Sequence, residues 1–188
     1  KTGTLMKNKV GDNISMVTSG WSFNDIEKKF DKHIIKSVPF YNEFHNIALK
    51  LSEFFIIDNT NILDIGCSTG TFLIDLSKKY PKKNYNINFI GIDPVGSMVK
   101  NANKKNKDKR VKFIKKSIFD IKGRKYNYIS AILTLQFIAP AQRQKAYNNI
   151  YKCLNVGGAL IIFEKTRAEY SKHEEINIGV YNDFKRTN

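Results

Sequence analysis

Two segments of the sequence carry residue types that suit the binding of a small polar ligand. The first, Asn61-Ile-Leu-Asp-Ile-Gly-Cys-Ser-Thr-Gly70, has the pattern of a buried strand that enters a tight turn and then a helix. Gly66 and Gly70 have no Cβ atom, so the backbone can bend sharply and a ligand can approach the main chain. The second, Ile87-Asn-Phe-Ile-Gly-Ile-Asp93, has the pattern of another buried strand and ends in a carboxylate. Together they predict a nucleotide-binding site.

The glycine turn differs from the turn that binds dinucleotides, which has the pattern G-x-G-x-x-G. Here three residues, including Cys67 and Ser68, separate the two glycines, and Asp64 stands two positions before the first of them. This variant suits S-adenosyl-L-methionine (SAM) better than NAD. Asp64 can favour the ammonium group of the methionine moiety through charge-assisted hydrogen bonds, directly or through water. The alternative role of Asp64 is to order the turn.

Asp93 is the best single candidate for a ligand-binding residue, because a carboxylate at this strand end can accept hydrogen bonds from both ribose hydroxyls. An aspartate here can also act only as a helix cap, since Asp93 precedes Pro94 at an expected helix start. A third strand should end near Ser117 and Ile118, where an adenine base would contact the chain. Ser117 can form a hydrogen bond but has no charge, so this signal is weak.

No side chain is assigned a catalytic role. His33, His45 and His173 are isolated and do not stand at ligand spacing with a cysteine or carboxylate cluster, so no metal site is predicted. Ser68 has no identifiable histidine base, and nucleophilic catalysis is therefore not supported.

The elements that position these residues follow from apolar runs that alternate with amphipathic helices. Repeated βα units give a mostly parallel sheet covered by helices on both faces, with ligands bound outside the carboxyl ends of the strands. The expected fold class is therefore α/β and Rossmann-like, as in SAM-dependent methyltransferases. The sequence predicts strands at 61–65, 87–92, 111–115, 127–134 and 158–163, and helices at 69–80, 95–105 and 140–154.

The segment before the sheet is expected to contain helices. Residues 1–20 lack clear periodicity and predict a loose arm, whereas apolar residues from Phe23 to Ile35 recur at helical spacing. Pro39 should end that helix, and a second should run from about Tyr41 to Phe55. We expect one SAM-binding domain over 21–188, with helices at 21–56, a βα core at 61–165 and the start of a helical segment at 166–188.

Composition fits this interpretation. The chain has 188 residues, of which 41% are hydrophobic, and these values suit one globular domain. We expect no membrane span, a soluble cytoplasmic protein, and reduced thiols at Cys67 and Cys153. A net charge of +15 is compatible with a nucleic-acid partner, and equally with the lysine-rich composition that an AT-rich genome produces.

Beyond this general pattern the sequence resembles the carboxy-S-adenosyl-L-methionine synthase family over nearly its whole length. The glycine turn is generic, whereas the flanking matches are more specific. The matching stretches are Trp21-Ser-Phe23, Ser37-Val-Pro-Phe-Tyr41, Leu63-Asp-Ile-Gly-Cys-Ser68, Leu133-Thr-Leu-Gln-Phe137, Pro140-Ala-Gln-Arg-Gln144, Ile150-Tyr151, Gly157-Gly-Ala-Leu160, Glu164-Lys165 and Asp183-Phe-Lys-Arg186.

The resemblance implies that SAM and prephenate are converted to carboxy-SAM and phenylpyruvate. The product then serves carboxymethylation of the wobble uridine of tRNA by a partner enzyme. In the implied mechanism the SAM methyl group loses a proton and captures carbon dioxide released from prephenate, so few protein acid–base groups are required. A homodimer is also implied. One alternative is an ordinary SAM-dependent methyltransferase acting on a small molecule or RNA. Another is a binding module without catalysis.

The resemblance also suggests roles for individual residues. Tyr41 would close over the cofactor, although it can equally serve as an aromatic anchor for its helix. Gly66, Cys67 and Ser68 would line the methionine end of SAM. Asp93, beside Pro94, would hold the ribose. The last sites carried over, Ser117 and Ile118, would border the adenine.

The sequence departs from the family pattern at several points. Ile132 stands where the family usually has an asparagine, and Ser117 stands where it has an aspartate. Family members continue beyond Asn188 into a segment whose arginine reads the new carboxylate and into the last two of seven strands. Without that segment we expect an exposed sheet edge unless a partner or a further segment covers it.

Overall fold

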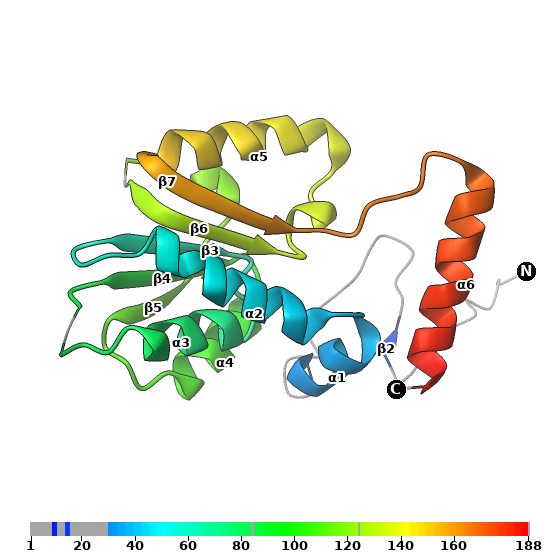
Figure 1. The fold of residues 1–188 in the computed structure, drawn as a ribbon, viewed down its shortest axis with the longest axis horizontal. Coiled ribbons are helices and arrows are strands. Elements are labelled where there is room, and N and C mark those ends of the chain that lie inside the picture. Colours follow the sequence, from blue (N-terminus) through cyan, green and yellow to red (C-terminus); the bar gives the residue numbers. More distant parts are fainter. Residues whose placement is uncertain (1–8, 11–13, 16–29, 84, 124, 188) are drawn as a thin grey trace, which may run out of the picture.

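The chain forms a parallel five-stranded sheet with helices on both faces, in a computed structural model that describes residues 9–10, 14–15, 30–83, 85–123 and 125–187. The strand order is β5-β4-β3-β6-β7, so the first long strand lies in the centre and the chain winds outward in both directions (Figure 1). This is the predicted Rossmann-like methyltransferase fold. The strands of this sheet are β3 (Asn61–Ile65), β4 (Asn88–Asp93), β5 (Val111–Lys115), β6 (Tyr126–Ile132) and β7 (Leu154–Phe163).

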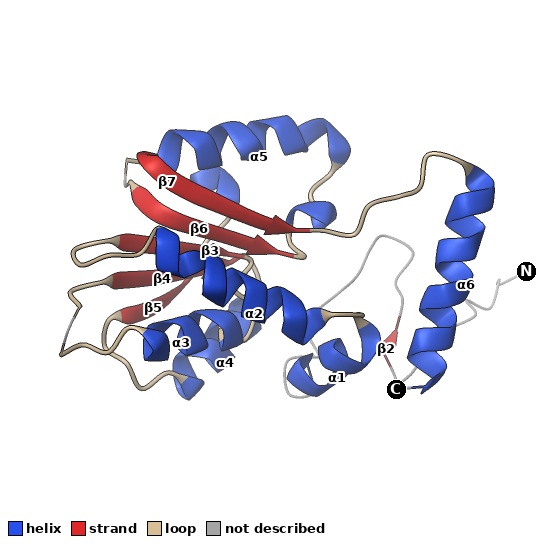
Figure 2. Ribbon diagram, in the orientation of Figure 1, coloured by secondary structure: helices blue, strands red, loops and turns tan. Residues whose placement is uncertain are grey.

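Alternate residues of the central strands face two separate apolar cores, because successive side chains of a strand point to opposite faces. Ile62 of β3 packs in one core, and its neighbour Leu63 packs in the other. Figure 2 shows helices on both faces of the sheet. The first face is covered by α2 (Tyr41–Leu51), α3 (Thr71–Lys79) and α4 (Gly96–Lys105), and the second by α5 (Pro140–Cys153).

The remaining elements are short or lie outside the sheet. An antiparallel pair joins β1 (Lys9–Val10) to β2 (Ile14–Ser15). Helix α6 (Ser171–Thr187) lies away from the sheet and contacts α1 (Phe30–Ser37). Among the described residues no helix is long and apolar enough to cross a membrane. Single 3₁₀ turns occur at η1 (Ser52–Phe54), η2 (Ile118–Asp120) and η3 (Leu135–Phe137).

Several predicted boundaries need correction, among them the helix expected from residue 69, which begins at Thr71. The strand expected to reach residue 134 ends at Ile132, because Leu133 adopts a left-handed φ of 53° that no extended strand allows. The last strand begins at Leu154 rather than residue 158, because Leu154 pairs with Tyr126 across a register shift. The second helix ends at Leu51 and continues only as η1. The break near Pro39 is present, whereas the expected helix before Phe30 lies outside the described residues.

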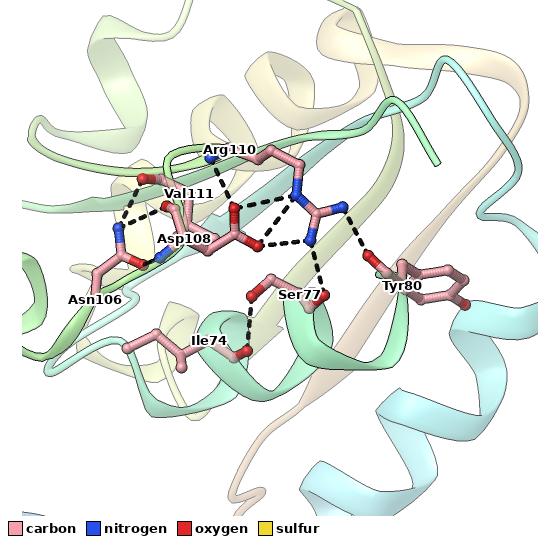
Figure 3. Close-up of polar contacts among 7 residues, drawn as sticks. All are labelled: Ile74, Ser77, Tyr80, Asn106, Asp108, Arg110 and Val111. Carbon is pink, nitrogen blue, oxygen red and sulfur yellow. Dashed lines mark hydrogen bonds and ion pairs between the residues drawn. The ribbon is translucent and has the colours of Figure 1, made fainter. Parts of the chain in front are cut away.

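A polar network joins the end of α3 to the segment before β5 (Figure 3). The Arg110 guanidinium, whose side chain is only 11% exposed, pairs with the Asp108 carboxylate at 2.6 Å. It also donates to the main-chain oxygens of Tyr80 at 2.6 Å and Ser77 at 3.1 Å. These carbonyls end a helix, where a cation is favoured. The network therefore lies where the strands begin, at the side of the sheet opposite the carboxyl ends of the strands.

Candidate functional site

The glycine turn and Asp93 meet at the carboxyl ends of β3 and β4. The main-chain N–H groups of Gly66 and Cys67 donate to the carbonyl oxygen of Ile92 at 2.8 and 3.0 Å. The N–H of Ser68 donates to Oδ2 of Asp93 at 3.0 Å. The parallel pairing of β3 with β4 brings these strand ends together. The two segments singled out in the sequence therefore form one continuous surface.

The turn is held in a conformation that requires its glycines. Gly66 and Gly70 have φ values of 72° and 79°. A Cβ atom on Gly66 would lie 2.3 Å from Oγ1 of Thr134, and one on Gly70 would lie 2.5 Å from the ring of Phe113. Ser68 shares the left-handed region with a φ of 50°. Strain of this kind persists only where surrounding contacts enforce it, and it is concentrated at functional sites.

Asp93, the last residue of β4, holds two main-chain amides and still has acceptor capacity. Oδ1 accepts the main-chain N–H of Val95 at 2.8 Å, at the start of α4, while Oδ2 holds Ser68. Burial raises the pKa of Asp93, and these two backbone hydrogen bonds oppose the rise. A carboxylate oxygen has two lone-pair sites, so each oxygen can accept one further hydrogen bond. The N-cap of α4 is Val95, and no side chain caps this helix, so Asp93 orders the turn before α4 rather than capping the helix and keeps capacity for a diol.

Asp64 lies deeper than Asp93. Its Oδ1 accepts the hydroxyl of Ser130 at 2.7 Å, from the paired position on β6. Burial raises the pKa of Asp64 to about 7, a rise to which Asp93 adds and which the Ser130 hydrogen bond opposes. The carboxyl group therefore titrates near neutral pH and can respond to a nearby cation. Its predicted contact with an ammonium group remains a prediction.

Tyr41 begins α2 and lies near two acidic residues, Asp31 and Asp64. Burial raises the pKa of its phenol, and Asp31 and Asp64 raise it further. The ring centroid lies 4.5 Å from that of His45, and Tyr41 lines a cavity of about 300 Å³ between α1, α2 and α3. Both predicted roles, anchoring the helix and closing over a ligand, fit this position.

The other predicted residues occupy the same edge of the sheet. Lys116 donates its N–H to the Asp93 carbonyl at 3.0 Å, which brings the exit of β5 beside that of β4. Ser117 accepts the N–H of Phe119 at 3.3 Å and caps η2, whereas Ile118 is buried in an apolar core. Pro94 is exposed just beyond Asp93.

The cysteine of the turn is not built for nucleophilic chemistry. Burial raises the pKa of the Cys67 thiol, and Asp64 and Asp93 raise it further. Because the thiolate is the reactive form, Cys67 lines the turn as a neutral thiol. The hydroxyl of Ser68 lies 3.6 Å from the sulfur of Met98. Within the described part of the chain, no group of three or more histidine, cysteine or acidic residues could hold a metal ion.

Comparison with known proteins identifies the family. A methyltransferase domain model matches residues 62–158. Carboxy-S-adenosyl-L-methionine synthase of Staphylococcus epidermidis is 39% identical over 170 residues, which are 89% of this chain and 73% of that protein. The chain belongs to the carboxy-S-adenosyl-L-methionine synthase family. The enzyme of the same name from Nautilia profundicola is 38% identical, over 86% of this chain and 68% of its own length.

Solved structures support the fold of this family member. The plantazolicin methyltransferase BpumL, in complex with a pentazolic desmethylPZN analog and SAH, superposes with a TM-score of 0.60 at 22% identity. That match covers 86% of this chain and 63% of the other. N-methyltransferase NodS from Bradyrhizobium japonicum, in complex with S-adenosyl-L-homocysteine (SAH), gives a TM-score of 0.55 at 22% identity and covers 66% and 61% of the two chains. At these identities the likeness concerns the fold.

Three residues beside the site of this carboxy-SAM synthase family member were not among the predicted site residues. Asp31 of α1 contacts the Thr69 hydroxyl and the ammonium of Lys105, and it thereby joins α1 to the glycine turn. Thr134 packs against Gly66, and Glu164 holds the loop that carries Thr134. Thr134 and Glu164 lie in two of the specific family matches, Leu133-Thr-Leu-Gln-Phe137 and Glu164-Lys165. Asp31 had no sequence signal.

Proposed function

We propose that this chain binds SAM across the carboxyl ends of β3, β4 and β5 and, with prephenate, converts it to carboxy-SAM and phenylpyruvate. The observation that carries the proposal is the junction of Ser68 and Asp93, with 3.0 Å between the Ser68 nitrogen and Oδ2 of Asp93. This junction sets a bend whose two glycines, Gly66 and Gly70, lack Cβ atoms beside a carboxylate with spare acceptor capacity. Membership of the carboxy-SAM synthase family supplies the reaction.

The residues present fit SAM in three parts. The methionine end would lie against Gly66, Cys67 and Ser68, where main-chain atoms can be approached closely. The ribose hydroxyls would donate to Asp93, and the adenine would lie beside Ser117 and Ile118. The sulfonium and ammonium charges are favoured by the two buried acids, Asp64 and Asp93. Tyr41 would close the site from α2.

The proposed reaction places few demands on protein acids and bases. The SAM methyl group loses a proton and forms a carbon–carbon bond with the carbon dioxide released from prephenate. The hydroxide that leaves prephenate takes the proton as water, and the ring becomes aromatic. The protein must hold the two molecules in register and exclude water. A neutral thiol at Cys67 suits this role, because a thiolate there would compete for an electrophilic methyl group.

The wider setting follows from the family. We propose that carboxy-SAM made here serves the carboxymethylation of wobble uridine in tRNA, and that the enzyme works in the cytoplasm as a homodimer. Size-exclusion chromatography with light scattering tests the dimer. A monomer at micromolar concentration would contradict that part of the proposal alone.

Mass spectrometry tests the reaction. The protein is incubated with SAM and prephenate, and the products are compared with those of reactions lacking one substrate. A SAM derivative heavier by the mass of one carbon dioxide, in which a carboxyl group replaces a methyl hydrogen, is the expected result, formed together with phenylpyruvate. SAM that remains unchanged over many hours in the presence of excess prephenate would refute the proposal.

A second candidate function is ordinary methyl transfer from SAM to a small molecule or RNA. One observation favours it: Ile132, where the family usually has asparagine, is partly buried against an apolar core and offers no polar contact. In that case SAH would form only after a methyl acceptor is added, and prephenate would have no effect on the products.

A further inference from the structure

A single carboxylate holds the loop that supports the glycine turn. Glu164 follows β7, and its Oε1 accepts the main-chain N–H groups of Thr134 and Leu135 at 3.0 and 2.7 Å. Its Oε2 accepts the N–H of Gln136 at 2.9 Å. These donors lie at the start of η3, where amides have no partner within their own turn. One side chain thus provides an acceptor for three consecutive amides.

Further contacts fix the same loop from two other elements. The N–H of Leu133 donates to the carbonyl of Phe163, the last residue of β7, at 2.7 Å. Arg143 of α5 donates to the carbonyls of Ile138 at 2.9 Å and Gln136 at 3.1 Å. Burial raises the pKa of Glu164, and the three backbone hydrogen bonds and the nearby Arg143 oppose that rise. The loop is therefore held by contacts from β7 and α5.

This conformation is strained where the loop leaves β6. Leu133 has a φ of 53°, in the left-handed region that leucine rarely adopts. Such a residue persists only when neighbouring contacts over-determine it. The three hydrogen bonds to Glu164 begin at the next residue, Thr134, and they are placed to hold Leu133 in this state. Without them the loop can relax toward ordinary backbone angles.

Thr134 connects the loop to the site. Its hydroxyl lies 2.9 Å from the carbonyl oxygen of Ile65, the residue before Gly66, and 3.1 Å from that of Ile132, so its one proton is placed for donation to either, with Ile65 nearer. The Thr134 side chain also fills the space that a Cβ on Gly66 would occupy. A displacement of Thr134 therefore changes the support behind the glycine turn at the point where the methionine end of SAM is proposed to lie.

We propose that Glu164 is a positioning residue for SAM binding, which acts through Thr134 on the glycine turn. The inference rests on the proposed binding of SAM at that turn. Replacement of Glu164 by glutamine keeps the size of the side chain but turns one acceptor oxygen into a donor group that faces an amide donor. Loss of a charged acceptor and the resulting unpaired amide should weaken SAM binding by about tenfold.

A double-mutant cycle separates positioning from general destabilisation. Calorimetry measures SAM and SAH binding to the wild type, Glu164→Gln, Thr134→Val and the double variant. If Glu164 acts through Thr134, each single variant weakens binding and the double variant is no weaker than the poorer single variant, within about twofold. Glu174→Gln is the matched control, because Glu174 also accepts a main-chain N–H, that of Ala168 at 2.9 Å, but lies on α6. Its affinity should equal that of the wild type.

The outcomes are distinguishable. Wild type that binds no SAM would refute the proposed function, and the inference with it. If Glu164→Gln binds SAM with the affinity of the wild type, the inference alone is refuted. The same holds if the losses of SAM affinity in the two single variants multiply in the double variant. A second measurement covers the case in which Glu164→Gln fails to fold. Hydrogen exchange on the wild type should then show the amides of residues 134–136 slowed at least tenfold by SAM, and unchanged exchange would refute the inference.

Discussion

The close contact behind the glycine turn predicts the cost of adding one methyl group there. In Gly66→Ala the residue would keep a φ of 72°, which costs alanine about 1 kcal/mol relative to glycine. The new Cβ would lie 2.3 Å from Oγ1 of Thr134, so that side chain must move and its hydrogen bond to Ile65 must stretch or break. Overpacking and the lost hydrogen bond add about 1–3 kcal/mol. The expected destabilisation is therefore about 2–4 kcal/mol.

Two control variants separate the contributions. Gly157 has a φ of 78° with nothing within 4 Å of the built Cβ, so Gly157→Ala should lose only about 1 kcal/mol. Gly91 is not in the left-handed region, but its Cβ would lie 2.6 Å from the ring of Phe113, so Gly91→Ala reports overpacking alone, about 1–3 kcal/mol. Urea unfolding of the variants gives the free energies. Equal losses in Gly66→Ala and Gly157→Ala would show that Thr134 does not press on the turn.

Three further predictions concern individual side chains. The pKa of Asp64 is raised from 3.8 to about 7, so the folded state binds the proton more tightly than the unfolded state. The stability of the fold should therefore decrease as the pH rises from about 4 to about 7. Over the same range SAM binding should tighten, because the ammonium group of SAM favours the ionised carboxylate. Asp64→Asn should remove both trends in urea titrations and calorimetry, and unchanged pH profiles would contradict the assignment. Asp93→Ala should weaken SAM binding by about 1–3 kcal/mol in calorimetry, and an unchanged affinity would place the ribose elsewhere. Arg110→Ala should destabilise the protein in urea by about 2–4 kcal/mol, since it removes the guanidinium that pairs with Asp108 and donates to the carbonyls of Tyr80 and Ser77. The substitution should leave SAM affinity unchanged, because Arg110 lies at the amino ends of the strands, opposite the proposed site. A large loss of SAM affinity would contradict this location of the site.

The sequence was sufficient to predict the fold and to identify the two main segments of the candidate site. Apolar runs that alternate with amphipathic helices predicted a parallel sheet, and parallel strands place their carboxyl ends at one edge. For that reason the glycine turn after β3 and Asp93 at the end of β4 could be expected to meet, and Ser68 indeed bonds Asp93. Hydrophobic periodicity and glycine spacing can be seen within short stretches of sequence, and the structure contains the strands and the turn that they predicted.

Contacts between distant segments could not be predicted in this way. Glu164 reaches the amides of residues 134–136 because β7 pairs with β6, and no periodicity encodes that carboxylate as a cap. The left-handed Leu133 was predicted as part of a strand, because leucine carries no signal for that conformation. Asp31 of α1 contacts Thr69 from 38 positions away in the sequence, a separation that no local pattern can report. The contacts that support the site from behind therefore depend on tertiary structure and have no local sequence signal.

A crystal structure of the protein with bound SAM tests the central claim most directly. The account predicts the ribose hydroxyls within hydrogen-bond distance of Asp93 and the methionine end against Gly66, Cys67 and Ser68, with Thr134 unmoved behind the turn. SAM bound at another surface, or side chains packed across the space between the glycine turn and Asp93, would contradict it.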